Sequence, residues 1–563
     1  MIIGKDRFRI MSRWVWPILS GALLAGAFPP FSETGETAWF ALVPLFWQLR
    51  RVSPREGFKA GFFSGLTFWV LTLCWFPAII KNNGPWALVL LGWAGLAAWC
   101  ALFFGAFGAL SARVWTWTRP ATPRFACGVL RLTAVLVIDP LLWVGLEWVR
   151  GWLFSGFAWN FLGVSQAGNL PIIQVASLAG VYGVSLLVVW GNGALTSLAE
   201  RMFSPIIRRL RNQPIFPQPF PLRIANSLES FLPFILILAA WGWGGTRVNR
   251  WRKEEAKVLD RDERAWRITL IQPNAPCVFE ANQELARVRF DGLREQTRLA
   301  DMTKPDLIVW PETATPGYLP GNEVTLGYVR SCLSEGGASL LTGTVEVERT
   351  EVPGVMRVYN AAWLLNAQGE RLGRYRKRHL VPFGEYIPFD KAIPILQKLA
   401  PTGESCTPGT DPGIITLANP AHSAPLQIGP IICFEDTIPA LCRETARAGA
   451  DLLALMTNDA WFNHSCEPLQ HRQQAVFRAV ETGLPLVRAA NSGISCFISP
   501  VGKIRQLENE GCATDFDGFL SLKIPVLPLS PPYLRWGDAI LAIPGALLAL
   551  GLALVRRRRI QTP

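Results

Sequence analysis

Charged residues are scarce in this sequence. Only 17% of the 563 residues are Asp, Glu, Lys or Arg, whereas a soluble globular protein carries about 25%. Half of the residues are hydrophobic, and the mean hydropathy is +0.24. This shortage excludes a chain made only of ordinary soluble domains. We therefore expect part of the chain to lie in lipid.

Histidines and paired cysteines are also few. The four histidines stand at positions 379, 422, 464 and 471, and the 11 cysteines include no CxxC pair. A metal centre built from several histidines or from cysteine pairs needs more ligands than this. We therefore expect no multi-histidine metal site.

The net charge of +13 admits two interpretations. A basic surface can bind nucleic acid, or arginines can orient membrane helices. The second interpretation fits better, because the excess is mostly Arg in short loops between apolar runs. We expect no nucleic-acid partner.

Long apolar runs dominate both ends of the sequence. A hydrocarbon core about 30 Å thick requires about 20 mostly apolar residues per helix. Runs of this kind cover residues 14–30, 57–80, 86–112, 129–149, 171–199, 230–246 and 535–555, and a shorter run covers 36–49. The short run leaves a choice between seven and eight helices. Residues 1–13 are basic and precede the first run, but further apolar runs follow directly, which favours a membrane helix over a cleavable signal peptide.

The distribution of arginines favours eight helices. Basic clusters precede the first run and follow the second, fourth, sixth and last runs, whereas the alternate loops hold few basic residues. Positively charged loops stay cytoplasmic. Both termini should then be cytoplasmic and residues 247–530 should lie on the opposite face. Arg247, Arg250, Arg252 and Lys253 disagree, but long translocated domains tolerate such charges.

The region between the seventh and eighth helices has a different pattern. Short β-branched runs alternate with turns and helical stretches, as expected for a soluble α/β domain. The expected strands are 267–272, 306–310, 339–344, 360–365, 427–433, 451–456, 486–490 and 494–499. The predicted domains are therefore a membrane domain at 1–246, a soluble domain at 247–530, and a C-terminal helix with a basic tail at 531–563.

Three positions of the soluble domain could carry chemistry. Glu312 follows one expected strand, Cys433 ends another, and Lys377 lies in a basic segment between them. A cysteine attacks as a thiolate, so a carboxylate could accept its proton, and a lysine could stabilise an oxyanion. The alternative readings are a buried core cysteine, a turn carboxylate and a solvated lysine. Spacing alone does not decide between these readings.

The motifs around these residues resemble the nitrilase, or carbon–nitrogen hydrolase, superfamily. Trp310-Pro-Glu312 is similar to its glutamate motif, Tyr375-Arg-Lys377 to its lysine motif, and Ile431-Ile-Cys433-Phe-Glu435 to its cysteine motif. With the membrane helices, and with the segments 379–388 and 457–462, the chain resembles the apolipoprotein N-acyltransferases of Gram-negative bacteria. This resemblance implies a polytopic α-helical membrane domain of about eight helices with an inserted nitrilase-like α-β-β-α sandwich.

The resemblance also implies a reaction in two stages. A phospholipid, usually phosphatidylethanolamine, gives its sn-1 acyl chain to the cysteine as a thioester. The free amine of a diacylglyceryl-cysteine in an apolipoprotein then accepts this chain. The enzyme is implied to be a monomer in the cell inner membrane, in contact with membrane lipids, with its soluble domain in the periplasm.

Roles for individual residues follow from the same resemblance. Glu312, Lys377 and Cys433 correspond to the catalytic triad. Supporting positions are Glu385, Glu435 and Phe434, where the family often has Tyr, and the candidate lip residues for acyl chains are Trp461 and Phe462. Further residues in family-like segments are Asn458, Arg478, Glu481, Arg488 and Asn491.

Several questions stay open from the residues alone. Arg478 and Glu481 stand three apart on an expected helix, which predicts an ion pair. Asp139 and Glu147 are costly in a membrane segment, and they either pair with Arg150 or mark an interface. The alternative functions are a membrane-tethered amidase, which would use water as the second acceptor, and a transporter. Seven or eight helices argue against a simple tether, and the few intramembrane charges argue against transport.

Overall fold

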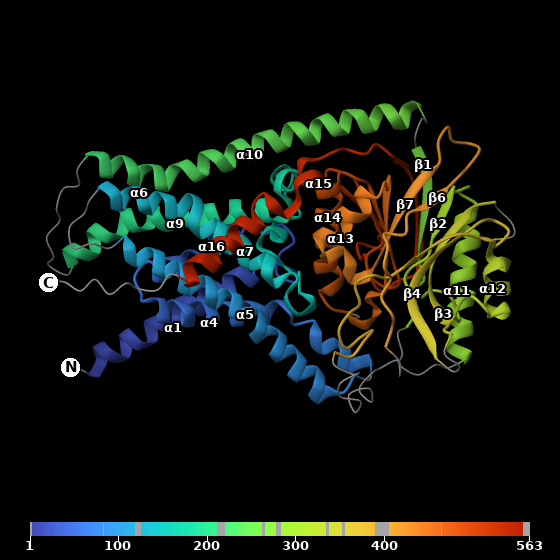
Figure 1. Cartoon of the computed structure of the whole chain (residues 1–563), viewed down its shortest axis with the longest axis horizontal. Helices are drawn as coiled ribbons and strands as arrows, with labels where there is room; N and C mark the ends of the chain where they lie inside the picture. The colour runs from blue at the N-terminus through green and yellow to red at the C-terminus, as the bar shows by residue number, and fades with distance from the viewer. Residues whose placement is uncertain are drawn as a thin grey trace. The chain divides into compact units, whose positions relative to one another are not determined.

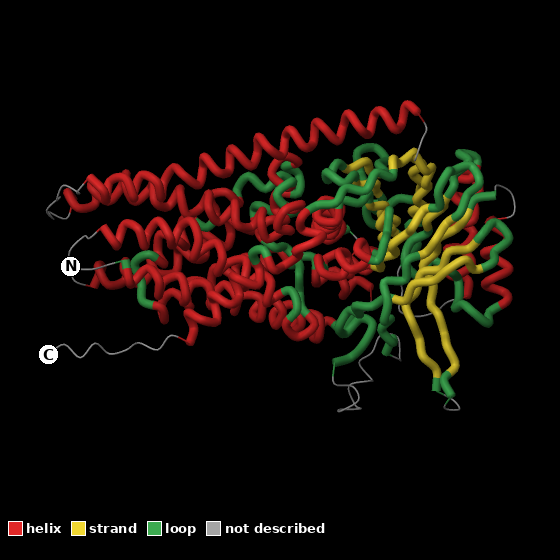
Figure 2. The backbone as a smooth tube through the Cα atoms, turned by 45° about the horizontal axis from the view of Figure 1, so that its top comes forward, coloured by secondary structure: helices red, strands yellow, loops and turns green. Residues whose placement is uncertain are grey.

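The computed structural model describes residues 3–554, except for residues 83, 119–124, 211–219, 262–264, 277–282, 334–336, 352–354, 389–404 and 463. The chain divides into two compact units. The helical unit contains Met1–Phe76, Ala87–Thr246 and Trp536–Pro563, and the mixed unit contains Pro77–Trp86 and Arg247–Arg535. The long helices gather in the first unit and the strands in the second (Figure 1; Figure 2).

Helices at all eight expected positions form the helical unit. Among the described residues, six segments are long and apolar enough to cross a membrane, namely Pro54–Asn82, Trp86–Trp117, Ala126–Arg150, Ala176–Ile206, Arg223–Arg261 and Pro532–Leu554. Two shorter apolar helices, Trp14–Ala25 and Ala38–Leu49, account for the other two runs. The principal helices are α1 (Ile3–Ala25), α2 (Ala38–Ala41), α3 (Val43–Leu49), α4 (Pro54–Thr72), α5 (Trp86–Trp117), α6 (Phe125–Thr133), α7 (Asp139–Arg150), α8 (Leu170–Ile173), α9 (Ala176–Leu210), α10 (Phe220–Arg261) and α16 (Ala542–Leu554).

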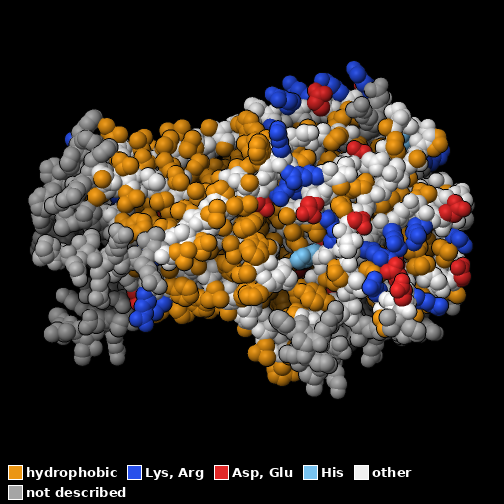
Figure 3. Space-filling model, viewed as in Figure 1, with side chains coloured by type: hydrophobic (Ala, Val, Ile, Leu, Met, Phe, Trp, Pro, Cys, Tyr) orange, Lys and Arg blue, Asp and Glu red, His pale blue; other side chains and the backbone are white. Residues whose placement is uncertain are grey.

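Glycines allow close packing between these helices. A Cβ atom on Gly61 of α4 would lie 2.1 Å from the backbone oxygen of Phe104 on α5, and one on Gly145 of α7 would lie 2.2 Å from the backbone of Gly545 on α16. Small residues at helix contacts are typical of membrane proteins, because burial against lipid-like side chains supplies little hydrophobic drive. Hydrophobic side chains cover the outer face of this unit in Figure 3.

Two six-stranded sheets form the centre of the mixed unit. The strand orders are β12-β1-β2-β3-β4-β5 and β11-β10-β9-β8-β7-β6. The first sheet contains β1 (Ala265–Gln272), β2 (Leu307–Val309), β3 (Ser339–Arg349), β4 (Met356–Leu365), β5 (Arg371–Arg376) and β12 (Gly518–Pro525). The second contains β6 (Ile415–Leu417), β7 (Leu426–Ile432), β8 (Leu452–Thr457), β9 (Leu486–Ala490), β10 (Cys496–Ile498) and β11 (Ile504–Gln506). All eight expected strands are present.

The two sheets pack face to face. One buried cluster joins Leu270 and Leu364 of the first sheet to Ile428 and Met456 of the second. Helices α11 (Gln283–Asp301) and α12 (Glu323–Leu333) cover the outer side of the first sheet, and α13 (Pro439–Arg447) and α14 (Glu467–Thr482) pack on the second (Figure 1). The predicted α-β-β-α sandwich is confirmed.

Candidate active site

The three residues of the expected triad lie at the ends of three strands of the sandwich. Glu312 follows β2, Lys377 follows β5 and Cys433 follows β7. Cys433 has a φ angle of +52°, which is uncommon for a residue with a side chain. It begins a short 3₁₀ turn, Cys433–Thr437, which is labelled η6. A nucleophile on such a turn is held in one conformation by its surroundings, because the backbone strain must be offset by contacts.

Lys377 joins two carboxylates. Its Nζ atom lies 3.4 Å from Oε1 of Glu312 and 2.9 Å from Oε1 of Glu385, and its side chain is 1% exposed. The Asn360 amide nitrogen donates to the same two oxygens, each at 2.7 Å. The backbone N–H of Lys377 also donates to the Asn360 carbonyl at 2.8 Å. Three groups therefore hold Lys377 directly, and its ammonium lies beside Glu312.

The second oxygen of Glu312 is held from another strand. The backbone N–H of Asn458, which follows β8, donates to Oε2 at 3.0 Å. The Asn458 side-chain oxygen accepts a hydrogen bond from the Asn491 amide at 2.9 Å. Both asparagines lie in the segments that resembled family motifs. They orient the carboxylate without adding a titratable group.

Glu435 connects the lysine segment to the turn that carries Cys433. It accepts hydrogen bonds from the Tyr375 hydroxyl at 2.8 Å, and from backbone N–H groups of Arg378, His379 and Ile432 at 2.7, 3.0 and 2.9 Å. Burial raises the pKa of Glu435, and the nearby Lys377 and these donors oppose that shift. The residue acts as a structural junction inside the site.

The environment of the Cys433 thiol favours its protonated form. Burial raises its pKa well above the ordinary value, and Glu312 raises it further, while Lys377 and a hydrogen bond with Thr457 lower it. Burial alone would lower the pKa of Lys377, but Glu385 and Glu312 raise it well above the ordinary value. The arrangement therefore offers a thiol, a carboxylate able to accept its proton and a fixed cation. Such a set suits nucleophilic attack on a carbonyl group.

The other candidate residues lie on neighbouring turns. Trp461 and Phe462 are half-buried in the 3₁₀ turn Asp459–Phe462, labelled η7. The Asn82 amide, from the Pro77–Trp86 segment of the mixed unit, donates to the carbonyl oxygen of Trp461 at 2.8 Å. The Phe434 ring stacks on His379 with 6.1 Å between the ring centres. The predicted ion pair between Arg478 and Glu481 forms at 2.9 Å.

The sequence predicted no role in the site for three of its parts. Asn360 stood at the start of an expected strand, and Tyr375 belonged to the lysine motif, but neither had a role assigned to it. A buried group of Asp459, Glu467 and His471 also adjoins the site, and Nδ1 of His471 lies 3.1 Å from Asp459 and 3.5 Å from Glu467. Arg488 lies 2.8 Å from Asp459 and supplies a positive charge there. Sequence spacing carries little signal for these contacts, because they depend on how the strands pair.

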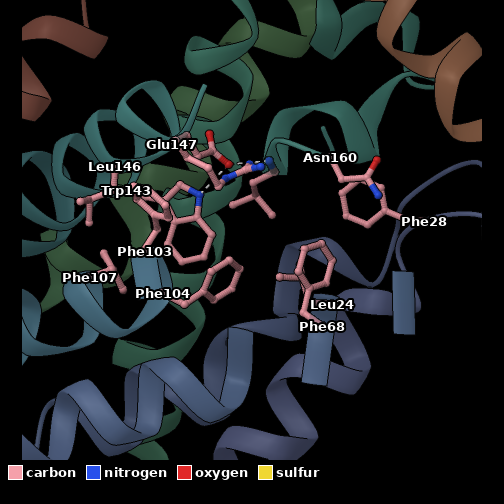
Figure 4. Close-up of a pocket in the computed structure, with 12 residues that line it drawn as sticks. Leu24, Phe28, Phe68, Phe103, Phe104, Phe107, Trp143, Leu146, Glu147 and Asn160 are labelled. Atoms are coloured by element: carbon pink, nitrogen blue, oxygen red, sulfur yellow. Dashed lines mark hydrogen bonds between the residues drawn. The ribbon is translucent and has the colours of Figure 1, made fainter. Parts of the chain in front are cut away.

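Glu147 and Asp139 lie inside the helical unit. Glu147 Oε1 accepts hydrogen bonds from the Leu162 backbone at 2.6 Å and from Trp143 at 3.0 Å, and Asp139 accepts one from Trp115 at 3.0 Å. Glu147 and Arg150 line a cavity among aromatic side chains (Figure 4). Its volume is about 20 Å³, which is room for about one water molecule. It is too small for an acyl chain, and Arg150 donates to the carbonyl oxygens of Phe157 and Trp159.

Comparison with known proteins gives a consistent result over the chain. Residues 20–194 match the model of the apolipoprotein N-acyltransferase N-terminal domain, and residues 269–510 match the carbon–nitrogen hydrolase model. The apolipoprotein N-acyltransferase of Geobacter metallireducens is 32% identical over 87% of this chain and 86% of its own length. That of Brucella suis biovar 1 is 30% identical over 99% of this chain and 100% of its own length.

A solved structure of an amidase from Nesterenkonia sp. matches less closely. It has a TM-score of 0.33 and 21% identity over 49% of this chain and 94% of its own length. At this TM-score the structural similarity supports no conclusion about the chain. The family models and the curated relatives agree with each other and together cover both units. The chain belongs to the apolipoprotein N-acyltransferase family, and it carries the carbon–nitrogen hydrolase domain of that family.

Proposed function

We propose that this enzyme transfers a fatty acyl chain from a membrane phospholipid, through a thioester on Cys433, to the N-terminal amine of diacylglyceryl-cysteine in apolipoproteins. The single observation that carries this proposal is the buried cluster in which Glu312 and Lys377 both act on the Cys433 thiol. Apolar helices long enough to span a membrane belong to the same chain. Phosphatidylethanolamine is the proposed donor.

In the first half-reaction Glu312 accepts the thiol proton as Cys433 attacks the sn-1 ester carbonyl of the donor. The new carbon–sulfur bond leaves an oxyanion, which the Lys377 ammonium and the backbone N–H of Phe434 stabilise. The ester carbon–oxygen bond then breaks. Glu312 returns the proton to the departing oxygen, so that lysophospholipid leaves and the acyl chain remains on sulfur.

In the second half-reaction the amine of the apolipoprotein attacks the thioester carbonyl. Glu312 accepts a proton from the attacking nitrogen, and the same two donors stabilise the second oxyanion. The carbon–sulfur bond breaks to give an amide, and the proton held by Glu312 returns to Cys433. Thioesters suit this task because a thiolate leaves readily when an amine attacks.

The supporting residues act on the triad rather than on the acyl group. Glu385 and Asn360 hold Lys377 and Glu312 in place, and Glu435 ties the lysine segment to the nucleophile turn. Trp461 and Phe462 are the proposed apolar lip for acyl chains. No metal or other cofactor is required by these steps, and we propose that the enzyme acts as a monomer.

The proposed topology places the catalytic domain, 247–530, in the periplasm. Domain 1–246 and the segment 531–563 would anchor it in the inner membrane, with both termini in the cytoplasm. Cys512 provides a native test, because it is exposed. A membrane-impermeant maleimide should label Cys512 in cells whose outer membrane alone is permeable, and C512S should lose this label. Labelling that requires lysis of the inner membrane would contradict the topology.

Transfer and hydrolysis can be separated in one assay. Purified protein is incubated with phosphatidylethanolamine labelled in its sn-1 chain, with or without a diacylated lipopeptide. We expect labelled triacylated lipopeptide as the product and little free fatty acid. Release of free fatty acid with no lipopeptide product would favour the amidase-like alternative, in which water is the second acceptor.

A further inference from the structure

A second buried charge cluster lies beside the triad. The His471 ring, on α14, is 2% exposed. Its Nε2 atom lies 2.9 Å from Oδ1 of Asp436, and its Nδ1 atom lies 3.1 Å from Oδ1 of Asp459. Asp436 belongs to the turn η6 that begins with Cys433, and Asp459 begins the turn η7 that contains Trp461. One imidazole therefore bridges the nucleophile turn and the proposed lip.

Only the charged form of this imidazole satisfies both contacts. Imidazolium donates through both nitrogens, whereas neutral imidazole donates through one and presents a lone pair at the other. A lone pair facing a carboxylate is repulsive, so the bridge requires His471 to carry two protons. Burial opposes the charge, but Asp436 and Asp459 outweigh this and raise the pKa of His471 to about 10.

The neighbouring groups balance this charge. Arg488 lies 2.8 Å from Asp459 on the side away from the imidazole, and Glu467 lies 3.5 Å from Nδ1 of His471. Burial and the charge of Asp459 raise the pKa of Glu467, which favours the neutral form of this carboxyl. The cluster then holds two carboxylates and two cations, which favours its burial without a net charge.

The same helix contacts the nucleophile turn at a second place. Arg478 of α14 donates to the carbonyl oxygens of Asp436 at 3.3 Å and Thr437 at 3.1 Å. On the other side, the Thr457 hydroxyl donates to Asp459 at 2.8 Å, and Thr457 is also a hydrogen-bond partner of the Cys433 thiol. A continuous set of polar contacts thus joins His471 to the sulfur without a direct contact.

We propose that His471 is a positioning residue for acyl transfer, whose imidazolium holds the turn of Cys433 and the loop of Trp461 and Phe462 in fixed register. This inference rests on the proposed function. Loss of one of the two hydrogen bonds would free the two turns to move separately. A displacement of about 1 Å at a reacting atom costs about 100-fold in rate.

The first test is H471Q, because glutamine cannot donate in two opposite directions. The single-turnover rate of Cys433 acylation, measured at saturating labelled phosphatidylethanolamine, should fall by about 100-fold. The donor concentration that gives the half-maximal rate should stay unchanged. The matched control is H422Q, since His422 also pairs with an aspartate, Asp306, at 3.1 Å in the same unit. H422Q should acylate at the wild-type rate.

The second test is the pH profile of D436N. Because the pKa of His471 in the folded protein is raised to about 10, the bridge is complete at neutral pH and is lost as pH rises through about 10. Asp436 is the largest of the charges that raise this pKa, so D436N should lower it. The introduced amide can donate to neutral imidazole, so the bridge no longer requires the charged ring, and the alkaline fall of the wild-type acylation rate should be absent from D436N. A purely structural role would lower the rate equally at every pH.

The outcomes separate this inference from the proposed function. Absence of any thioester on the wild-type protein would overturn both. A wild-type thioester together with an unchanged rate in H471Q would overturn the inference alone. If H471Q does not fold, the D436N profile decides, and an alkaline limb identical to that of wild type would overturn the inference.

Discussion

The two units each bury a cluster of charges, and the clusters differ in composition. In the helical unit, three arginines surround two glutamates: Glu200 lies 3.0, 2.9 and 2.8 Å from Arg50, Arg131 and Arg51, and Glu229 lies 2.7 Å from Arg131. The guanidinium groups of Arg50 and Arg131 also lie over the Trp115 ring, at 4.2 and 5.1 Å from its centre. The three arginines keep their charge and direct several donors at the two carboxylates.

In the mixed unit the balance is reversed. One lysine serves Glu312 and Glu385, and a thiol adjoins them. Because carboxylates outnumber cations in this cluster, it offers an acceptor for the thiol proton, whereas both glutamates of the helical cluster are paired with arginine. The difference indicates a structural cluster in one unit and a reactive cluster in the other. The predictions below address this contrast, from the largest effect on acyl transfer to the smallest.

Removal of the nucleophile should have the largest effect. C433A should form no triacylated lipopeptide from labelled phosphatidylethanolamine, because the proposed acyl carrier is absent. The matched control is C406S: Cys406 is also influenced by Glu385, Lys377 and Glu312, but it has no part in the reaction, so product should still form. If C433A still formed product and C406S did not, Cys406 would be the acyl carrier, and the assignment to Cys433 would be wrong.

Loss of the proposed base should come next. In E312Q the amide cannot accept the thiol proton, and the first-stage rate should fall by about 100-fold to 10,000-fold. Single-turnover acylation measures this rate, and a thermal melt checks that the protein remains folded. E346Q is a suitable control, because Glu346 is a buried carboxylate of the same sheet that pairs with Arg374 and Arg376. A rate in E312Q equal to that in E346Q would remove Glu312 from the mechanism.

Replacement of the lysine should slow both stages. K377M should lose about 100-fold to 1000-fold in each half-reaction, because both pass through an oxyanion. Because the pKa of Lys377 is raised in the wild type, its ammonium stays charged at every pH below the ordinary lysine pKa of about 10.5. The wild-type rate should therefore show no loss from lysine deprotonation between about pH 7 and 9. A defect in only one stage would contradict the oxyanion role.

The helical cluster should affect stability without affecting chemistry. E229Q removes one of the two carboxylates that Arg131 and Arg50 share and leaves Glu200 as their remaining partner, which should cost about 3 kcal/mol in the free energy of unfolding. A thermal melt in detergent measures the loss, and the acylation rate of Cys433 per folded molecule should equal that of wild type. A lower rate per folded molecule would show that the contrast between the two clusters is false.

Much of the fold was predictable from sequence, because apolar runs and β-branched runs are local signals. The four strands that were missed had weaker signals. β5 reads Arg-Leu-Gly-Arg-Tyr-Arg, with four polar or glycine positions in six, and β6 and β11 have three residues each. β12 is defined by its antiparallel pairing with β1, almost 250 residues away in sequence. Such pairing has no local pattern.

The site was predictable only in part for the same reason. Motif resemblance selected Glu312, Lys377 and Cys433, but the contacts among them depend on strand register. Asn360 reaches Glu312 because β4 pairs with β5 immediately before Lys377. His471 is 38 residues from Cys433 in sequence, and its place between Asp436 and Asp459 follows from the packing of α14 on the second sheet.

The central claim is that Cys433 carries the acyl chain between donor and acceptor. Wild-type protein is incubated with phosphatidylethanolamine labelled in its sn-1 chain, digested, and mapped by mass spectrometry before and after addition of a diacylated lipopeptide. The account predicts an acyl group on the peptide that contains Cys433, and its transfer to the lipopeptide on addition. An acyl group on another residue, or one on Cys433 that the lipopeptide does not remove, would contradict it.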